Sequence, residues 1–95
     1  MPPRTVVIVF TLPGCGHCSE FLPRFKARAA RVVGQVPIHV VNADAPQHTA
    51  LAERLGVTAT PAMYVLRHPT GMLKLEGAVT DAEIDALLSV ALAYR

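Results

Sequence analysis

The hexapeptide Pro13-Gly14-Cys15-Gly16-His17-Cys18 contains both cysteines of the 95-residue chain, separated by two residues. It follows the apolar run Thr5 to Phe10, whose β-branched residues predict a strand buried on both faces. From Gly16 onward the apolar residues recur at helical spacing, which predicts a helix that ends at Gly34. The cysteines therefore lie at a strand-to-helix turn, with Cys15 where the helix begins.

The composition is that of one folded domain over residues 1–95, with 52% hydrophobic and 17% charged residues. A net charge of +2 and an aromatic content of 5% do not favour nucleic-acid binding. No apolar stretch has the length of a signal peptide or a membrane span, so we expect a cytoplasmic monomer without a membrane partner. In that reducing compartment, two cysteines indicate catalysis or metal binding rather than a structural disulfide.

The later elements are indicated by apolar runs, by glycine and proline boundaries and by a helix capping box. They are a buried strand over 36–41, a helix over 47–55, strands over 62–67 and 72–76 joined by a hairpin turn at 68–71, and a helix over 80–94. The order strand-helix-strand-helix-strand-strand-helix predicts an α/β fold. It has a four-stranded mixed sheet with helices on both faces.

Some side chains also have an expected place in this fold. His39 lies inside an apolar run, so we expect it in the core, and Val33 is expected to widen the apolar stripe of the first helix. Glu20 stands four residues before Arg24 and is expected to support it. A cationic set on the same helix is expected to be a solvated face: Arg24, Lys26, Arg28 and Arg31.

The position of Cys15 favours a reactive thiol. Free backbone N–H groups and the positive end of the dipole at a helix N-terminus stabilise a thiolate. Cys18 lies one turn later on the same face, where it can form a disulfide with Cys15 and is expected to be less exposed. We therefore predict that Cys15 is the nucleophile, that Cys18 resolves the mixed disulfide, and that His17 stabilises the Cys15 thiolate.

A C-x-x-C pair also occurs in metal-binding proteins, so a second hypothesis remains open. The histidines do not have the spacing of a structural zinc site, which needs four ligands. The two thiolates could still hold copper(I), zinc or a shared iron–sulfur cluster as a metal-carrier module.

Residues 12–23 resemble the active-site segment of the thioredoxin superfamily, and Cys-Gly-His-Cys is similar to the catalytic domains of protein disulfide isomerases. Residues 57–61, Val-Thr-Ala-Thr-Pro, are similar to the family's loop that ends in a cis-proline facing the dithiol. The resemblance implies a thioredoxin-like fold and a thiol–disulfide oxidoreductase active in redox homeostasis and electron transport.

The same resemblance implies a set of binding residues and partners. Gly14, Gly16, Thr60 and Pro61 would bind the substrate, a disulfide-containing protein or small molecule. The redox-active pair would need no other cofactor, and a thioredoxin reductase or glutathione would supply electrons. The N-terminus of the last helix, at residues 80–81, could take a glutathione carboxylate, although ordinary helix capping is the favoured interpretation.

Three departures from the family pattern qualify these expectations. The N-terminal strand and helix of full-size thioredoxins are missing, which leaves a layout similar to glutaredoxins. Gly14 stands where relatives usually carry tryptophan, which would open the site. Val9 and Val40 stand where thioredoxins keep a buried acid and its lysine. Water or His17 would therefore have to accept the proton of Cys18.

Overall fold

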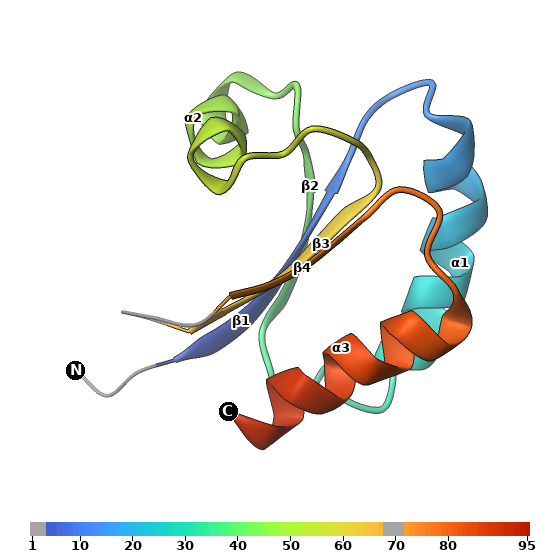
Figure 1. Cartoon of the computed structure of the whole chain (residues 1–95), viewed down its shortest axis with the longest axis vertical. Coiled ribbons are helices and arrows are strands. Elements are labelled where there is room, and N and C mark those ends of the chain that lie inside the picture. Colours follow the sequence, from blue (N-terminus) through green and yellow to red (C-terminus); the bar gives the residue numbers. More distant parts are fainter. Residues whose placement is uncertain (1–3, 68–71) are drawn as a thin grey trace.

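The computed structural model describes residues 4–67 and 72–95 (Figure 1). The described chain forms four strands and three helices in the predicted order. They are β1 (Thr5–Thr11), α1 (Gly16–Ala29), β2 (Ile38–Asn42), α2 (Pro46–Leu55), β3 (Ala62–Arg67), β4 (Met72–Glu76) and α3 (Asp81–Ala93). The hairpin turn predicted at 68–71 lies outside the described residues. None of the helices of the described chain is long and apolar enough to span a membrane.

The sheet has the strand order β2-β1-β3-β4. Strand β1 pairs with β2 in parallel and with β3 antiparallel, and β3 pairs antiparallel with β4. The predicted mixed sheet is thereby confirmed, as is the interior position of β1, whose residues 7–10 are all buried. The turn after β1 therefore emerges from the centre of the sheet.

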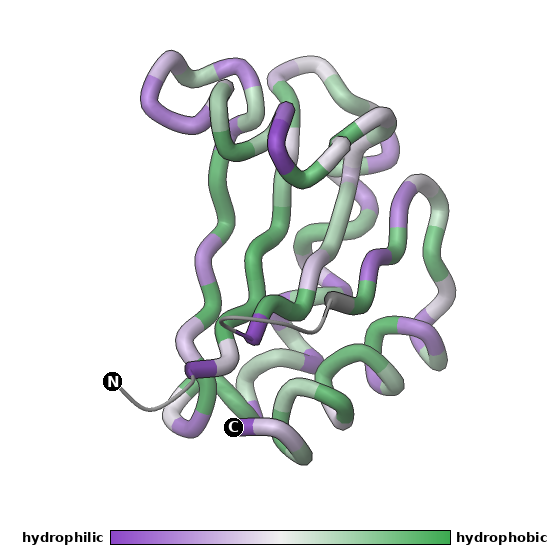
Figure 2. The backbone as a smooth tube through the Cα atoms, turned by 60° about the vertical axis from the view of Figure 1, so that its left-hand side comes forward, coloured by the Kyte–Doolittle hydropathy of each residue, from purple (hydrophilic) through white to green (hydrophobic). Residues whose placement is uncertain are grey.

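Helices α1 and α3 cover one face of the sheet, and α2 covers the other (Figure 1). The larger hydrophobic cluster includes Phe21 and Phe25 of α1, stacked with ring centroids 5.5 Å apart, and Ile84 and Leu87 of α3. The smaller cluster places Ala52 of α2 over the second face of β1 and β3. In Figure 2 the inner strands are hydrophobic along most of their length, because both faces are covered.

The prediction that the first helix extends to Gly34 is wrong. Helix α1 ends at Ala29, and residues 30–35 form turns. Hydrogen bonds from Val32 N to Ala29 O (2.9 Å) and from Gln35 N to Val32 O (2.8 Å) tighten the winding. This change rotates Val33 out of the apolar stripe, so that its side chain is 62% exposed, while Val32 remains buried.

The strand predicted over residues 36–41 is present and runs parallel to β1, but the prediction that it is buried is wrong. Strand β2 begins at Ile38 and is an edge strand, paired only with β1 among the described strands. His39 is exposed rather than in the core, and Val40 is 44% exposed. An apolar run does not distinguish an edge strand from a central one, because that difference depends on which strands pair.

Candidate active site

The backbone between β1 and α1 makes a tight turn. Cys15 N donates to Leu12 O at 3.3 Å, and Gly14 has a φ of +76°. A Cβ at Gly14 would meet no atom within 4 Å, so the constraint is the left-handed backbone rather than space. A tryptophan would be strained in this backbone conformation, which the glycine permits.

Cys15 is the N-cap of α1. Its backbone is extended (φ −78°, ψ 110°), and its Sγ accepts a hydrogen bond from Cys18 N at 3.1 Å. The sulfur thus has the place that a serine or aspartate oxygen usually has in an N-cap. No acidic residue lies in the first turn of α1, so the helix dipole acts on the sulfur without a competing negative charge.

The two cysteines form a disulfide, with Cα atoms 5.2 Å apart. Cys18 is 4% exposed, whereas Cys15 is partly exposed at the end of the turn. The expectation that Cys18 is the less accessible sulfur is confirmed. An incoming disulfide can reach Cys15 more readily than Cys18, which is the accessibility that a nucleophile and a resolving cysteine require.

The loop before β3 brings Thr60 and Pro61 to the sulfurs. The Thr60–Pro61 peptide bond is cis, as the resemblance implied, and Pro61 is buried. Thr60 Oγ1 donates to Cys15 Sγ at 3.4 Å, and Thr60 O lies 3.6 Å from the same sulfur. In the reduced protein a Cys15 thiol can donate to Thr60 O, and a Cys15 thiolate can accept from the Thr60 hydroxyl.

The other residues predicted for the site lie around this centre. Gly16 and His17 are exposed in the first turn of α1. Within the described residues, no hydrogen bond joins the His17 ring to either sulfur, so its effect on the thiolate stays a prediction. Val9 is fully buried and pairs with Val40 and Met63 in the neighbouring strands, which leaves only apolar side chains at that level of the sheet.

The N-terminus of α3 is satisfied by its own side chains. Thr80 Oγ1 accepts from Glu83 N at 3.1 Å, and Glu83 Oε1 accepts from Thr80 N at 2.8 Å. The Asp81 carboxylate pairs with Arg24 at 2.6 Å and with Arg28 at 3.0 Å. This confirms the capping interpretation of residues 80–81, because the Thr80 and Glu83 amides already donate to side chains of the capping box and the nearby arginines already pair with Asp81.

The expectation of a solvated cationic face on α1 is correct only for part of the set. Lys26 and Arg31 are exposed, but Arg24 and Arg28 are partly buried against α3. Arg24 Nε also donates to Glu20 Oε1 at 2.6 Å, the pair that the spacing predicted. The sequence of α1 alone does not indicate that Asp81 and Asp85 of α3 pair with these two arginines.

The sequence did not predict two features near the site. A pocket of about 250 Å³ lies beside Thr60, with an apolar lining that includes Leu12 and Val57 and with two acidic residues, Asp44 and Glu53. In addition, Glu76 of β4 contacts Thr58 in the loop that carries Thr60. Neither feature has a local sequence signal, because its residues come from separate elements.

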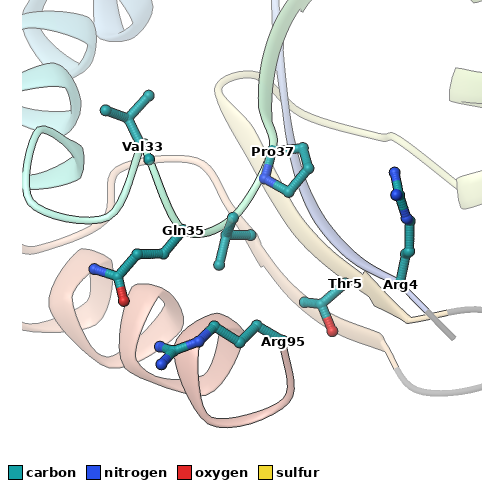
Figure 3. A pocket seen from close by; sticks show the side chains of 8 residues that line it. Arg4, Thr5, Val33, Gln35, Pro37 and Arg95 are labelled. Atoms are coloured by element: carbon teal, nitrogen blue, oxygen red, sulfur yellow. The ribbon is translucent and has the colours of Figure 1, made fainter. Parts of the chain in front are cut away.

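A second pocket, of about 410 Å³, lies at the far end of the sheet (Figure 3). Thr5 lines it at the start of β1, together with Gln35, Pro37 and Arg95, whereas the dithiol follows the other end of the same strand. The seven residues of β1 put its two ends, Thr5 and Thr11, roughly 20 Å apart. This pocket is therefore separate from the sulfur chemistry.

Comparisons with known proteins agree with the fold and with the motif. The thioredoxin family model matches residues 2–90. Over 83 residues the chain is 36% identical to bovine protein disulfide-isomerase A4, covering 86% of this chain and 13% of that protein. It is 34% identical over 65 residues to protein disulfide-isomerase MPD1 of Saccharomyces cerevisiae, covering 68% of this chain and 20% of that protein.

Solved structures show the same architecture. A thioredoxin of Malassezia sympodialis superimposes with a TM-score of 0.81 at 21% identity, covering 94% of this chain and 76% of that one. The J-Trx1 fragment of ERdj5 gives a TM-score of 0.78 at 23% identity, covering 95% of this chain and 44% of that one. The match to the family model, over nearly all of the described sheet and helices, shows that this chain belongs to the thioredoxin family.

Proposed function

We propose that this chain is a thiol–disulfide oxidoreductase that acts on disulfides of other proteins. The observation that carries the proposal is the position of Cys15 Sγ, at the N-terminus of α1 and within 3.4 Å of Thr60 Oγ1. Both surroundings stabilise a thiolate on the more exposed cysteine of the pair. The names of the protein disulfide isomerases that it resembles support the same chemistry, although the chain spans less than a quarter of their length.

The reaction would proceed by two exchange steps. The Cys15 thiolate attacks one sulfur of the substrate disulfide, so that a mixed disulfide forms and one substrate thiolate leaves and takes a proton. Cys18 then loses its proton, and its thiolate attacks Cys15 Sγ. The second substrate thiolate leaves and takes a proton. Two electrons have then passed to the substrate, the Cys15–Cys18 disulfide has formed, and the two protons taken up match those that Cys15 and Cys18 lost on ionising.

The proton of Cys18 needs an acceptor in the second step. The buried Val9 stands where thioredoxins keep an acid, so we propose that water or His17 accepts this proton. The open turn at Gly14 and Gly16 would give water access to the sulfurs.

An extended polypeptide fits the surface beside Cys15. We assign substrate binding to Gly14, Gly16, Thr60 and Pro61, with the backbone groups of Thr60 pairing with the substrate chain. The neighbouring pocket, with its acidic residues Asp44 and Glu53, would take a side chain of the polypeptide.

The electron donor is a separate question from the substrate. We propose a thioredoxin reductase, with glutathione as the alternative donor. The capping of α3 by Thr80 and Glu83 favours the reductase, because it occupies the helix N-terminus that a glutathione carboxylate would need. We also propose that the protein works as a cytoplasmic monomer, which fractionation and sedimentation of the tagged chain would test.

The metal-carrier hypothesis is not favoured by the family comparisons. Within the described residues, no group of three or more histidine, cysteine or acidic side chains gathers to hold a metal ion. Metal analysis of the anaerobically purified protein gives a direct test, since tightly held stoichiometric metal would favour the carrier over the oxidoreductase.

The decisive experiment is trapping of the mixed disulfide. A Cys18→Ser variant, reduced and then mixed with insulin, should form a covalent adduct through Cys15 that dithiothreitol reverses, because the resolving thiol is gone. The unchanged chain should catalyse insulin reduction by dithiothreitol without accumulating the adduct. Absence of both the adduct and the catalysis would reject the proposed function.

A further inference from the structure

The loop that presents Thr60 is held at its ends by backbone hydrogen bonds. Val57 N donates to Ala52 O of α2 at 3.0 Å, and Gly77 N donates to Pro61 O at 2.9 Å. Among the described residues, no backbone–backbone hydrogen bond holds the intervening residues 58–60. Their position therefore depends on side-chain contacts.

Glu76, the last residue of β4, supplies such a contact. Its Oε2 accepts from Thr58 Oγ1 at 2.6 Å and from Thr58 N at 3.3 Å. Its Oε1 pairs with Lys74 Nζ at 2.9 Å, and its side chain is only 15% exposed. The Thr58 hydrogen bond, followed by that of Lys74, lowers the pKa of Glu76, so the carboxylate is ionised at neutral pH.

Glu76 makes no hydrogen bond to the buried Tyr64 hydroxyl among the described residues. The nearby Tyr64 is buried, and its hydroxyl has no hydrogen-bond partner among the described residues. Both oxygens of Glu76 are instead directed to Thr58 and Lys74. The carboxylate thus serves the loop rather than the buried phenol beside it.

The same short loop ends at the reactive sulfur. Thr60 is two residues beyond Thr58, and its hydroxyl donates to Cys15 Sγ at 3.4 Å. Displacement of the loop would lengthen or misalign this contact and so weaken the hydrogen bond. Loss of a donor to a thiolate raises the pH at which the thiol ionises.

We propose that Glu76 is a positioning residue for Cys15: by fixing Thr58, it holds the Thr60 hydroxyl against the Cys15 sulfur. The consequence for turnover rests on the proposed oxidoreductase function, whereas the effect on Cys15 ionisation does not. Strand β4 thereby influences the ionisation of Cys15 indirectly, through the Glu76 carboxylate and the loop residues Thr58 and Thr60.

The test measures the rate of Cys15 alkylation by iodoacetamide against pH in the fully reduced protein, with mass spectrometry to identify the modified cysteine. Thr58→Val removes the hydroxyl at nearly constant volume, and Glu76→Leu removes both acceptor oxygens. We expect each to move the midpoint of the profile upward by about half a pH unit or more. Thr58→Ser keeps the hydroxyl and should retain the parent profile.

Glu83→Leu is the matched control, because it removes a glutamate whose side-chain hydrogen bond among the described residues is to Thr80 at the start of α3. It should lower the melting temperature without moving the alkylation profile. A shift equal to that of Glu76→Leu would overturn the proposal, since general loosening would then explain both. An unchanged profile in folded Thr58→Val or Glu76→Leu protein would also overturn it.

A double variant separates a shared pathway from two independent effects. If Glu76 acts through Thr58, then Glu76→Leu combined with Thr58→Val should shift the profile no further than the larger single shift. Additive shifts would overturn the proposal. Because alkylation needs no disulfide substrate, these outcomes remain readable even if the unchanged chain fails to reduce insulin, which would reject only the proposed function.

Discussion

The helices α1 and α3 pack on the same face of the sheet, yet their N-termini have opposite chemistry. Helix α1 begins with a sulfur that accepts from Cys18 N, and its first turn carries no acidic residue. Helix α3 begins with the Thr80–Glu83 capping box and has Asp81 in its first turn. At the start of α1 the free end of the helix dipole faces a sulfur, whereas the start of α3 is capped by a hydroxyl and a carboxylate of its own residues.

The difference between the two helices is whether acidic side chains of the protein already lie at the N-terminus and offset the positive end of the helix dipole. At α3, three carboxylates and two arginines form a network in which Arg24 donates to both Glu20 and Asp81. At α1, the described hydrogen bonds to Cys15 Sγ come from one amide and one hydroxyl, both neutral. A thiolate there gains stabilisation that no neighbouring anion has already used.

The largest expected effect comes from making the cap of α1 chemically inert. Cys15→Ser keeps an N-cap oxygen for Cys18 N, so the reduced variant should melt within a few degrees of the reduced parent. It should lose insulin reduction entirely, because the nucleophile is gone. Retention of full activity would show that the cap position is not where the chemistry occurs.

The next effect comes from placing an acid in the first turn of α1, as in α3. His17→Asp should raise the midpoint of Cys15 alkylation by about one pH unit, because its charge opposes the thiolate. His17→Gln isolates the contribution of the imidazole and should move the profile less. If the two variants shifted the profile equally, the compensating acid would have no role in the difference between the helices.

A smaller effect is expected when the α3 cap is removed. Thr80→Ala should lower the free energy of unfolding by about 1 kcal/mol and the melting temperature by about 5 °C, since Glu83 N loses its acceptor. Thr80→Ser should restore most of this loss. The rate of insulin reduction at a temperature where both are folded should not change, and a parallel fall in rate would contradict the division of roles.

The smallest effect concerns acid stability. Hydrogen bonds from Arg24 lower the pKa values of Glu20 and Asp81, and the backbone N–H of Thr80 lowers that of Glu83. At a pH between the folded and the unfolded pKa of such a carboxyl group, the unfolded chain binds more protons than the folded protein. The contribution of these groups to stability is therefore fully present above the unfolded pKa and is lost as the pH falls through the folded pKa. Melting temperatures measured below about pH 4.5 should decline, and less steeply in Asp81→Asn.

The sequence predicted those features of the site that depend on residues close together in the chain. The spacing of Cys15 and Cys18 after a β-branched run predicted the turn, the N-cap position and the lower exposure of Cys18, because these are local consequences of a strand followed by a helix. The motif Thr80-Asp81-Ala82-Glu83 predicted its capping box for the same reason. The resemblance to the thioredoxin superfamily added the cis bond before Pro61, which no local pattern of this chain required.

The incorrect predictions concern features that depend on how distant elements pack together. His39 and Val40 were expected to be buried, but the strand order places them at an edge, and Val33 left the stripe when the helix ended early. The carboxylates that Arg24 and Arg28 contact across the helix interface, Asp81 and Asp85, lie in α3, 57 residues away in the chain. In each case the outcome depended on which elements pack together rather than on the nature of the residue.

Local chemistry along the chain was therefore enough to specify the order of elements, the dithiol at the start of α1 and the capping box at the start of α3. The folded arrangement alone decided that Thr60 reaches Cys15 Sγ and that Glu76 reaches Thr58, 18 residues earlier in the chain. Helix periods and caps arise from backbone geometry over a few residues. Contacts between a strand end and a distant loop exist only after the sheet has assembled and brought them within hydrogen-bond distance.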